Sequence, residues 1–152
     1  MKFVRFQQLK EHALTACREE GRSLPDPDRM NPVVLALIGD SVFTFYVRMR
    51  LLAVSSHVQV IHTIAASMVS AVMQAKAMHV LEAGLDGKEA AVVHRGRNAK
   101  SMAPKSASVS EYRAATAFEA LCGWLLLTDQ EPRLAEFVEQ ACQVISREMQ
   151  SS

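Results

Sequence analysis

Two acidic side chains stand in apolar stretches that have the composition of buried helices. Asp40 lies within LALIGDSVF and Glu119 within YRAATAFEALCGWLLL, and no other acid in the sequence has such neighbours. A carboxylate is costly in apolar surroundings unless something compensates its charge. Two carboxylates from two central helices can converge on a divalent cation, since hard oxygen ligands suit Mg²⁺ or Mn²⁺. Alternatively, each acid pairs with an arginine such as Arg48 or Arg113, or accepts hydrogen bonds from a helix end.

Two glycines lie in the same apolar stretches, Gly39 directly before Asp40 and Gly123 four residues after Glu119. A glycine inside a helix costs about 1 kcal/mol relative to alanine. Their presence suggests a close helix contact, or a backbone that approaches a partner closely.

A basic segment follows in the middle of the chain. HRGRNAK, residues 94–100, continues to Lys105 with four cationic side chains and no acid, in a chain whose net charge is only +1. Arginine, lysine and asparagine side chains are the usual contacts to nucleic-acid phosphates. The alternative is a solvated charged loop. The low net charge argues against strong non-specific binding to polyanions.

The composition predicts one all-α domain to carry these residues. Hydrophobic residues make up 49% of the 152 residues, aromatic residues only 6%, and Gly and Pro are few. Such a chain can close a core, and it lacks the turn residues of a many-stranded fold. Hydrophobic periodicity and capping residues predict helices over 3–20, 33–52, 57–83, 86–97, 111–128 and 132–149.

The helix over 33–52 is apolar nearly all round and is therefore expected to be mostly buried at the centre. Asn31 and Pro32 supply its N-cap and its first-turn proline. Gly21 and Gly84 are expected to end the helices before them.

Targeting and redox signals indicate a cytoplasmic protein. Charged residues interrupt the N-terminal apolar residues where a signal peptide needs an unbroken stretch. The uncharged stretch 51–75 is long enough to span a bilayer, but its polar residues favour a buried helix pair. Three cysteines without a CxxC pair make a disulfide framework or a zinc site improbable.

Three blocks of the sequence resemble one enzyme family. LALIGDSVFTFYVRMRLL resembles a helix of ribonuclease III catalytic domains. HRGRNAKS, followed by PK and by YRAATAFEALCGWLLL, is similar to the Mini-III ribonucleases, which lack a double-stranded RNA-binding domain. The resemblance runs in order over 31–127, and we expect the whole chain, 1–152, to form a single ribonuclease III-like catalytic domain.

This resemblance implies a metal-dependent endonuclease that cleaves double-stranded RNA to 5′-phosphate and 3′-hydroxyl ends. It implies an obligate-type homodimer, no membrane association, and maturation of the large-subunit (23S) ribosomal RNA precursor. Asp40 and Glu119 match the catalytic metal-binding carboxylates, with Mg²⁺ as the metal and Mn²⁺ as a substitute. Longer family members usually have two further acids, where this sequence has Ala36 and Thr116. Mg²⁺ accepts one or two carboxylates with water and phosphate, so two acids can suffice.

The resemblance also implies an RNA-binding role for the basic loop, with Lys105 near the scissile phosphate. The implied RNA-binding residues are Arg95, Arg97, Asn98, Lys100 and Lys105, and the implied supporting residues are Tyr112, Arg113 and Thr116. Because Ala36 and Thr116 are not acids, an inert module that binds structured RNA or ribosomal particles is an alternative. A helical dimerisation module without RNA is a third.

Overall fold

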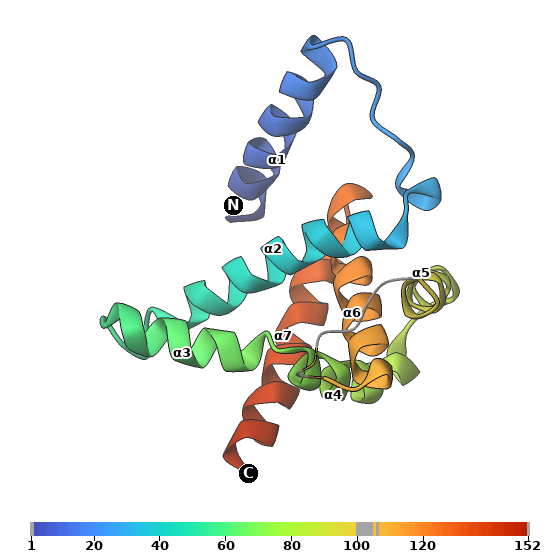
Figure 1. Cartoon of the computed structure of the whole chain (residues 1–152). Coiled ribbons are helices and arrows are strands. Elements are labelled where there is room, and N and C mark those ends of the chain that lie inside the picture. The colour runs from blue at the N-terminus through green and yellow to red at the C-terminus, as the bar shows by residue number, and fades with distance from the viewer. Residues whose placement is uncertain (1, 100–104, 106, 152) are drawn as a thin grey trace. The chain divides into compact units, whose positions relative to one another are not determined.

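The computed structural model describes residues 2–99, 105 and 107–151, with side chains from Gln7 onward. Over these residues it is all-α, as predicted, with no strand. The elements in chain order are α1 (Lys2–Glu19), η1 (Pro27–Arg29), α2 (Pro32–Leu51), α3 (Val58–Met68), α4 (Ala71–Leu81), η2 (Glu82–Gly84), α5 (Gly87–Arg97), α6 (Val109–Leu127) and α7 (Glu131–Gln150), where η marks a short 3-10 helix (Figure 1).

The chain forms two compact units, Met1–Met30 and Asn31–Ser152. The first unit consists of α1 and an extended segment that ends in η1. Gly21 follows α1 with a φ of +77°, a left-handed conformation that glycine adopts without strain, which confirms it as the end of the helix. The second unit contains both candidate carboxylates.

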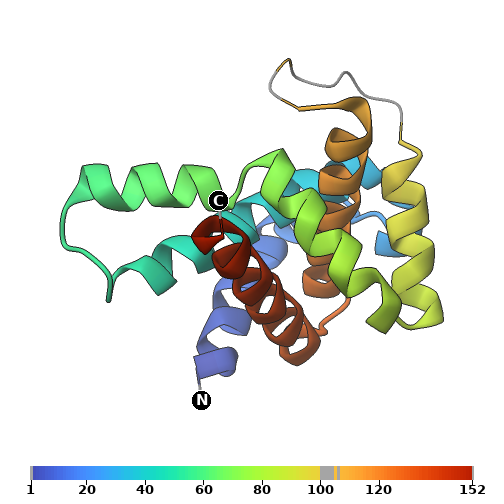
Figure 2. The same ribbon diagram turned by 90° about the horizontal axis from the view of Figure 1, so that it is seen from below.

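Helix α6 is the centre of the second unit, with α2, α4, α5 and α7 packed around it (Figure 2). The rings of Phe43, Phe118 and Phe137 join α2, α6 and α7, with centroid distances of 4.9 and 5.2 Å. Both Cys122 and Trp124 of α6 are buried. Because α6 is covered on several sides, it takes the central place that the sequence assigned to α2.

Helix α2 is buried on one face only, which corrects the expectation of a mostly buried helix. Its buried residues are Leu35, Ala36, Gly39, Phe43, Val47 and Leu51. On another face Leu37 and Phe45 are 67% and 53% exposed. By length and composition α2 could cross a membrane, as could α3 with α4 if they formed one bent span. When a helix is apolar all round, its sequence does not show which face packs against another helix. In this protein α6 covers one face of α2.

The contact between α2 and α6 depends on two glycines, as the sequence predicted. A Cβ atom on Gly39 would lie 1.7 Å from the carbonyl oxygen of Glu119, and one on Gly123 would lie 2.0 Å from that of Leu35. Any side chain at either position would push the helices apart. The two backbones therefore touch beside both candidate carboxylates.

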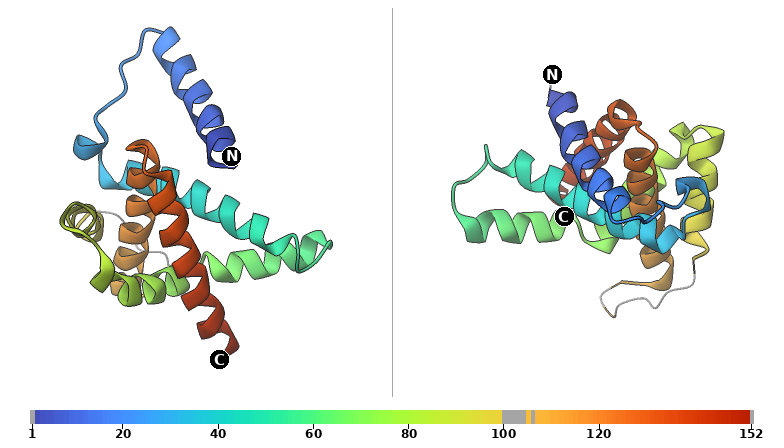
Figure 3. Two further views of the ribbon diagram at one scale, coloured as in Figure 1. Left: turned by 180° about the vertical axis from the view of Figure 1, so that it is seen from behind. Right: turned by 90° about the horizontal axis from the view of Figure 1, so that it is seen from above.

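The predicted helix over 57–83 is two helices, so this prediction was wrong. The chain breaks at Val69 and Ser70, and α3 and α4 meet at a bend of 51°. The Ser70 side chain accepts a hydrogen bond from the Met73 backbone N–H at 3.3 Å, which caps α4. Helix α3 folds back beside α2 through the connecting segment 52–57, and the two form a projecting hairpin (Figure 3).

Capping residues fix the starts of the helices that carry the site. The Asn31 side chain accepts from the Val33 N–H at 2.9 Å at the start of α2. Asp86 with Glu89, and Ser108 with Glu111, form capping boxes at α5 and α6.

Candidate active site

Asp40 of α2 and Glu119 of α6 lie beside each other where the two helices touch. Their carboxyl groups are close enough for Asp40 to act on the pKa of Glu119. They share an open cleft of about 440 Å³ with both apolar and polar walls. The other residues that line this carboxylate cleft are Val33, Val34, Ala36, Leu37, Tyr112 and Thr116. The sequence-based prediction that the two acids converge is confirmed.

The two acids differ in their exposure to solvent. Glu119 is half-buried, but Asp40 is exposed, so the expectation of two buried acids was wrong for Asp40. Of its apolar neighbours in the sequence, Phe43 packs into the core, whereas Leu37 lines the same open cleft as Asp40. Within the part of the chain that the structure describes, neither acid forms an ion pair with Arg48 or Arg113.

Burial, the charge of Asp40 and a hydrogen bond with Asp40, in this order of size, together raise the pKa of Glu119 to about 8. At neutral pH Glu119 therefore keeps a proton, and the pair carries less charge than two free carboxylates. A cation held between them would take the place of that proton.

The donor set at this site fits a hard divalent cation. The two positions where longer relatives of the resembled family have acids hold the methyl group of Ala36 and the hydroxyl of Thr116, which donates to the Tyr112 carbonyl at 3.0 Å. Among the described residues, no group of three or more His, Cys, Asp or Glu could hold a metal. Two carboxylates in an open cleft match Mg²⁺, which keeps several waters and takes phosphate oxygens as further ligands.

Two other acids are more deeply buried than either of these, which the sequence did not indicate. They are Glu89 and Glu131, at 2% and 3% exposure. The Glu89 carboxylate accepts from Arg133 at 2.8 and 3.2 Å and from the Asp86 N–H at 3.1 Å. Its capping position was visible in the sequence, but the arginine comes from α7, 44 residues away. This acid is compensated and holds α5 to α7.

The basic segment is not uniformly available to solvent. Arg97 forms a two-point ion pair with Glu82, at 2.6 and 3.2 Å. Asn98 contacts the His94 ring at 3.1 Å, Arg95 is half-buried and Lys105 is exposed. Lys100 lies outside the described residues. Sequence reasoning missed Glu82, which stands fifteen positions before its partner and carries no local signal.

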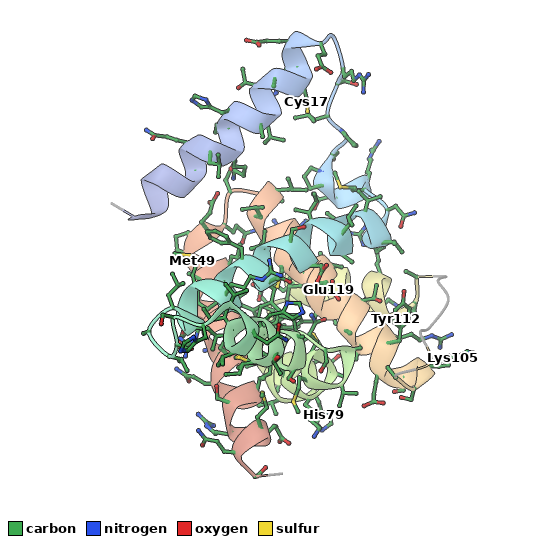
Figure 4. All side chains as sticks on the ribbon, turned by 60° about the vertical axis from the view of Figure 1, so that its left-hand side comes forward. Cys17, Met49, His79, Lys105, Tyr112 and Glu119 are labelled. Atoms are coloured by element: carbon green, nitrogen blue, oxygen red, sulfur yellow. The ribbon has the colours of Figure 1, made fainter. Side chains whose placement is uncertain are left out.

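A second cavity of about 590 Å³ lies on another face of α6. Residues 112, 116 and 119 recur at helical spacing and line the carboxylate cleft, whereas Arg113 lines this second cavity. Figure 4 shows Tyr112 and Glu119 along α6, with Lys105 beyond its start. We call the second cavity the α4–α6 groove; its lining is Ala75, His79, Arg97, Asn98, Val109, Ser110, Glu111, Arg113 and Ala114.

The carboxylate cleft lies inside a region that matches a known family. The family model of the ribonuclease III domain matches residues 33–130, which include Asp40, Glu119 and most of the residues around them. This chain belongs to the ribonuclease III family. It is an endoribonuclease of that type, as the resemblance implied.

Similar proteins agree with this assignment. The chain is 43% identical over 125 residues to the Mini-ribonuclease 3 of Brevibacillus brevis, covering 81% of this chain and 93% of that protein. It is also 43% identical over 127 residues to the Mini-ribonuclease 3 of Symbiobacterium thermophilum, covering 82% and 97%. A crystal structure of a Fusobacterium nucleatum protein has the same fold, with a TM-score of 0.72, 23% identity, and coverage of 76% of this ribonuclease and 96% of that chain.

Proposed function

We propose that this ribonuclease cleaves double-stranded RNA with a divalent metal, and that Asp40 and Glu119 are its catalytic, metal-binding residues. The observation that supports this is the meeting of the two carboxylates in an open cleft at the contact of α2 and α6. The proposed metal is Mg²⁺, with Mn²⁺ as a substitute. The products are 5′-phosphate and 3′-hydroxyl ends.

The chain's own residues prepare the site in two ways. Asp40 presents an exposed carboxylate to the cleft, and Glu119 gives up its proton when a cation arrives. A divalent metal held by Asp40 and Glu119 would lower the pKa of a bound water and polarise the phosphodiester. Gly39 keeps the two carboxylates at a fixed separation, because it lets the helix backbones touch. Tyr112 and Thr116 line the same cleft in supporting positions.

The proposed RNA contacts come from the segment that precedes α6. A-form RNA is recognised through its shape, its 2′-hydroxyls and its phosphates. We assign phosphate contacts to Arg95, Arg97, Asn98, Lys100 and Lys105, with Lys105 near the scissile phosphate. The exposure of Lys105 close to the start of α6 supports this assignment. Arg113 also supports this assignment, because it lines the α4–α6 groove together with Arg97 and Asn98.

We also propose a homodimer, in which two sites act on the two strands of one duplex. The exposed apolar residues of α2 support a second copy as the partner, because Leu37 and Met49 are 67% and 52% exposed. Introducing a charge with Met49→Glu, at a position that lines neither cavity, is expected to shift the protein toward the monomer in sedimentation. An unchanged sedimentation coefficient would place the dimer contact elsewhere.

For the natural substrate we propose the 23S ribosomal RNA precursor, which rests on the similarity to the Mini-ribonuclease 3 proteins. We place the protein in the cytoplasm with that substrate, and treat 1–152 as one catalytic domain. The alternative is an inert module that binds structured RNA or ribosomal particles, suggested by Ala36 and Thr116. The paired carboxyl groups favour the enzyme, because a module that only binds RNA has no use for two acids brought together in one cleft.

A cleavage assay on duplex RNA, with and without Mg²⁺, tests the proposal. Asp40→Asn and Glu119→Gln keep the side-chain shape and remove the charge, so metal-dependent cleavage should collapse while duplex binding survives. Glu136→Gln is the matched control, because Glu136 is exposed on α7 and lines neither cavity. Full cleavage by both site variants would locate the active site elsewhere. Binding without cleavage by the unaltered protein at any Mg²⁺ concentration would support the inert module.

A further inference from the structure

One arginine of the proposed RNA-binding segment already binds an acid of its own chain. Both terminal nitrogens of Arg97 contact the two carboxylate oxygens of Glu82, at 2.6 and 3.2 Å. Two parallel N–H···O bonds are also the way in which a guanidinium binds a phosphate group. The Glu82 carboxylate therefore occupies the face of Arg97 that an RNA phosphate would use.

The ion pair between Arg97 and Glu82 lies where another anion can replace the carboxylate. The side chains of Arg97 and Glu82 are 36% and 43% exposed, so solvent and ligands reach both. Arg97 lines the α4–α6 groove together with His79 and Arg113, so a phosphate entering there would meet several nitrogen groups. Hydrogen bonding and charge from Arg97 lower the pKa of Glu82, and the charge of His79 acts in the same direction.

The pair differs from the ion pair that holds α5 to α7. There the Glu89 side chain is only 3% exposed, so the charges cannot separate without leaving a buried carboxylate unpaired. Exposed ion pairs contribute little to stability, because water and salt screen them. Separating Arg97 from Glu82 therefore costs little free energy.

We propose that Glu82 acts as an internal phosphate mimic: in the free enzyme it holds Arg97, and duplex RNA binds in the α4–α6 groove by exchanging this carboxylate for a backbone phosphate. This inference rests on the proposed function, since it names a contact of the same RNA substrate. The displaced carboxylate then lies beside the RNA backbone and repels it. Glu82 therefore weakens duplex binding and lowers the number of counterions released.

Glu82→Gln tests the exchange, because glutamine keeps the shape and loses the charge. In a salt series with a short blunt-ended duplex, affinity is expected to rise roughly two- to fivefold. The slope of log affinity against log salt should become steeper by up to about 0.9. KM should fall by the same factor with kcat unchanged, because the phosphate contact is equally strong in the ground state and the transition state. The melting temperature serves as a check that the variant is folded.

Two further variants separate this exchange from a general charge effect. Glu136→Gln removes the same charge from a carboxylate that pairs with Arg133, away from the groove, and should leave the salt slope unchanged. In an Arg97→Gln background, Glu82→Gln should no longer steepen the slope, because no guanidinium is left to take a phosphate.

Each other outcome has a definite meaning. Equal effects of Glu82→Gln and Glu136→Gln would overturn the exchange and leave only long-range charge. A folded Glu82→Gln variant with unchanged or weaker binding would overturn it as well, and would make the pair a positioning contact. If the unaltered protein cleaves duplex RNA in these cases, the proposed function stands. If it neither binds nor cleaves, the proposed function fails and the exchange fails with it.

Discussion

The protonated Glu119 predicts that the metal-free protein loses stability as the pH rises, and that Glu119→Gln removes this loss. The folded pKa is about 8, above the 4.5 of the unfolded side chain, so the folded state binds more protons between these values. Stability from this group is fully present below about pH 4.5 and is lost as the pH rises through 8.

The size of the effect follows from the displacement of the pKa. The loss amounts to about 3 kcal/mol at pH 7 and approaches about 5 kcal/mol above pH 8. These are upper limits, because Asp40 is exposed and water screens its charge. Glutamine stays neutral at every pH, so the variant should be more stable than the natural protein at pH 8 and similar to it at pH 4.5.

Urea unfolding with a chelator, at several values between pH 4.5 and 9, measures this difference. Saturating Mg²⁺ should reduce it, because a bound cation replaces the proton and stabilises only the folded protein. Glu136→Gln controls for the loss of one negative charge. Parallel stability curves of the natural protein and Glu119→Gln across this range would refute the protonated carboxylate pair.

Three further predictions concern the elements around the site. Gly39→Ala should destabilise the fold by about 3 kcal/mol or more, measured by urea unfolding, because its Cβ would meet the Glu119 carbonyl oxygen at 1.7 Å; a stability equal to that of the natural protein would disprove the close contact. Arg133→Met leaves Glu89 buried and unpaired and should cost about 3 to 5 kcal/mol at pH 7 by the same method; a loss below about 1 kcal/mol would show that Arg133 does not compensate Glu89. Lys105→Ala should flatten the salt dependence of duplex binding by about 0.9, equally for unrelated duplex sequences; an unchanged slope would assign Lys105 to solvent.

The starts and ends of several helices were predictable, because their signals are local. Asn31 caps α2 and Gly21 ends α1, as the sequence indicated. Each signal involves atoms within a few residues along the chain. The break at Ser70 was missed, although serine is a common cap, because the apolar periodicity continues on both sides of it.

The sequence by itself singled out Asp40 and Glu119, since acids are rare in apolar helices, and the glycines that let their helices touch. The tertiary structure determined how exposed each acid is and which charged groups lie beside it. Asp40 is exposed because α6 covers only one face of α2, which periodicity along a single helix cannot reveal. Likewise, Glu89 is compensated by an arginine 44 residues away, and Glu82 at the start of η2 holds Arg97 at the end of α5. Partners distant in sequence meet only when helices pack, and they determine which charges remain available for RNA.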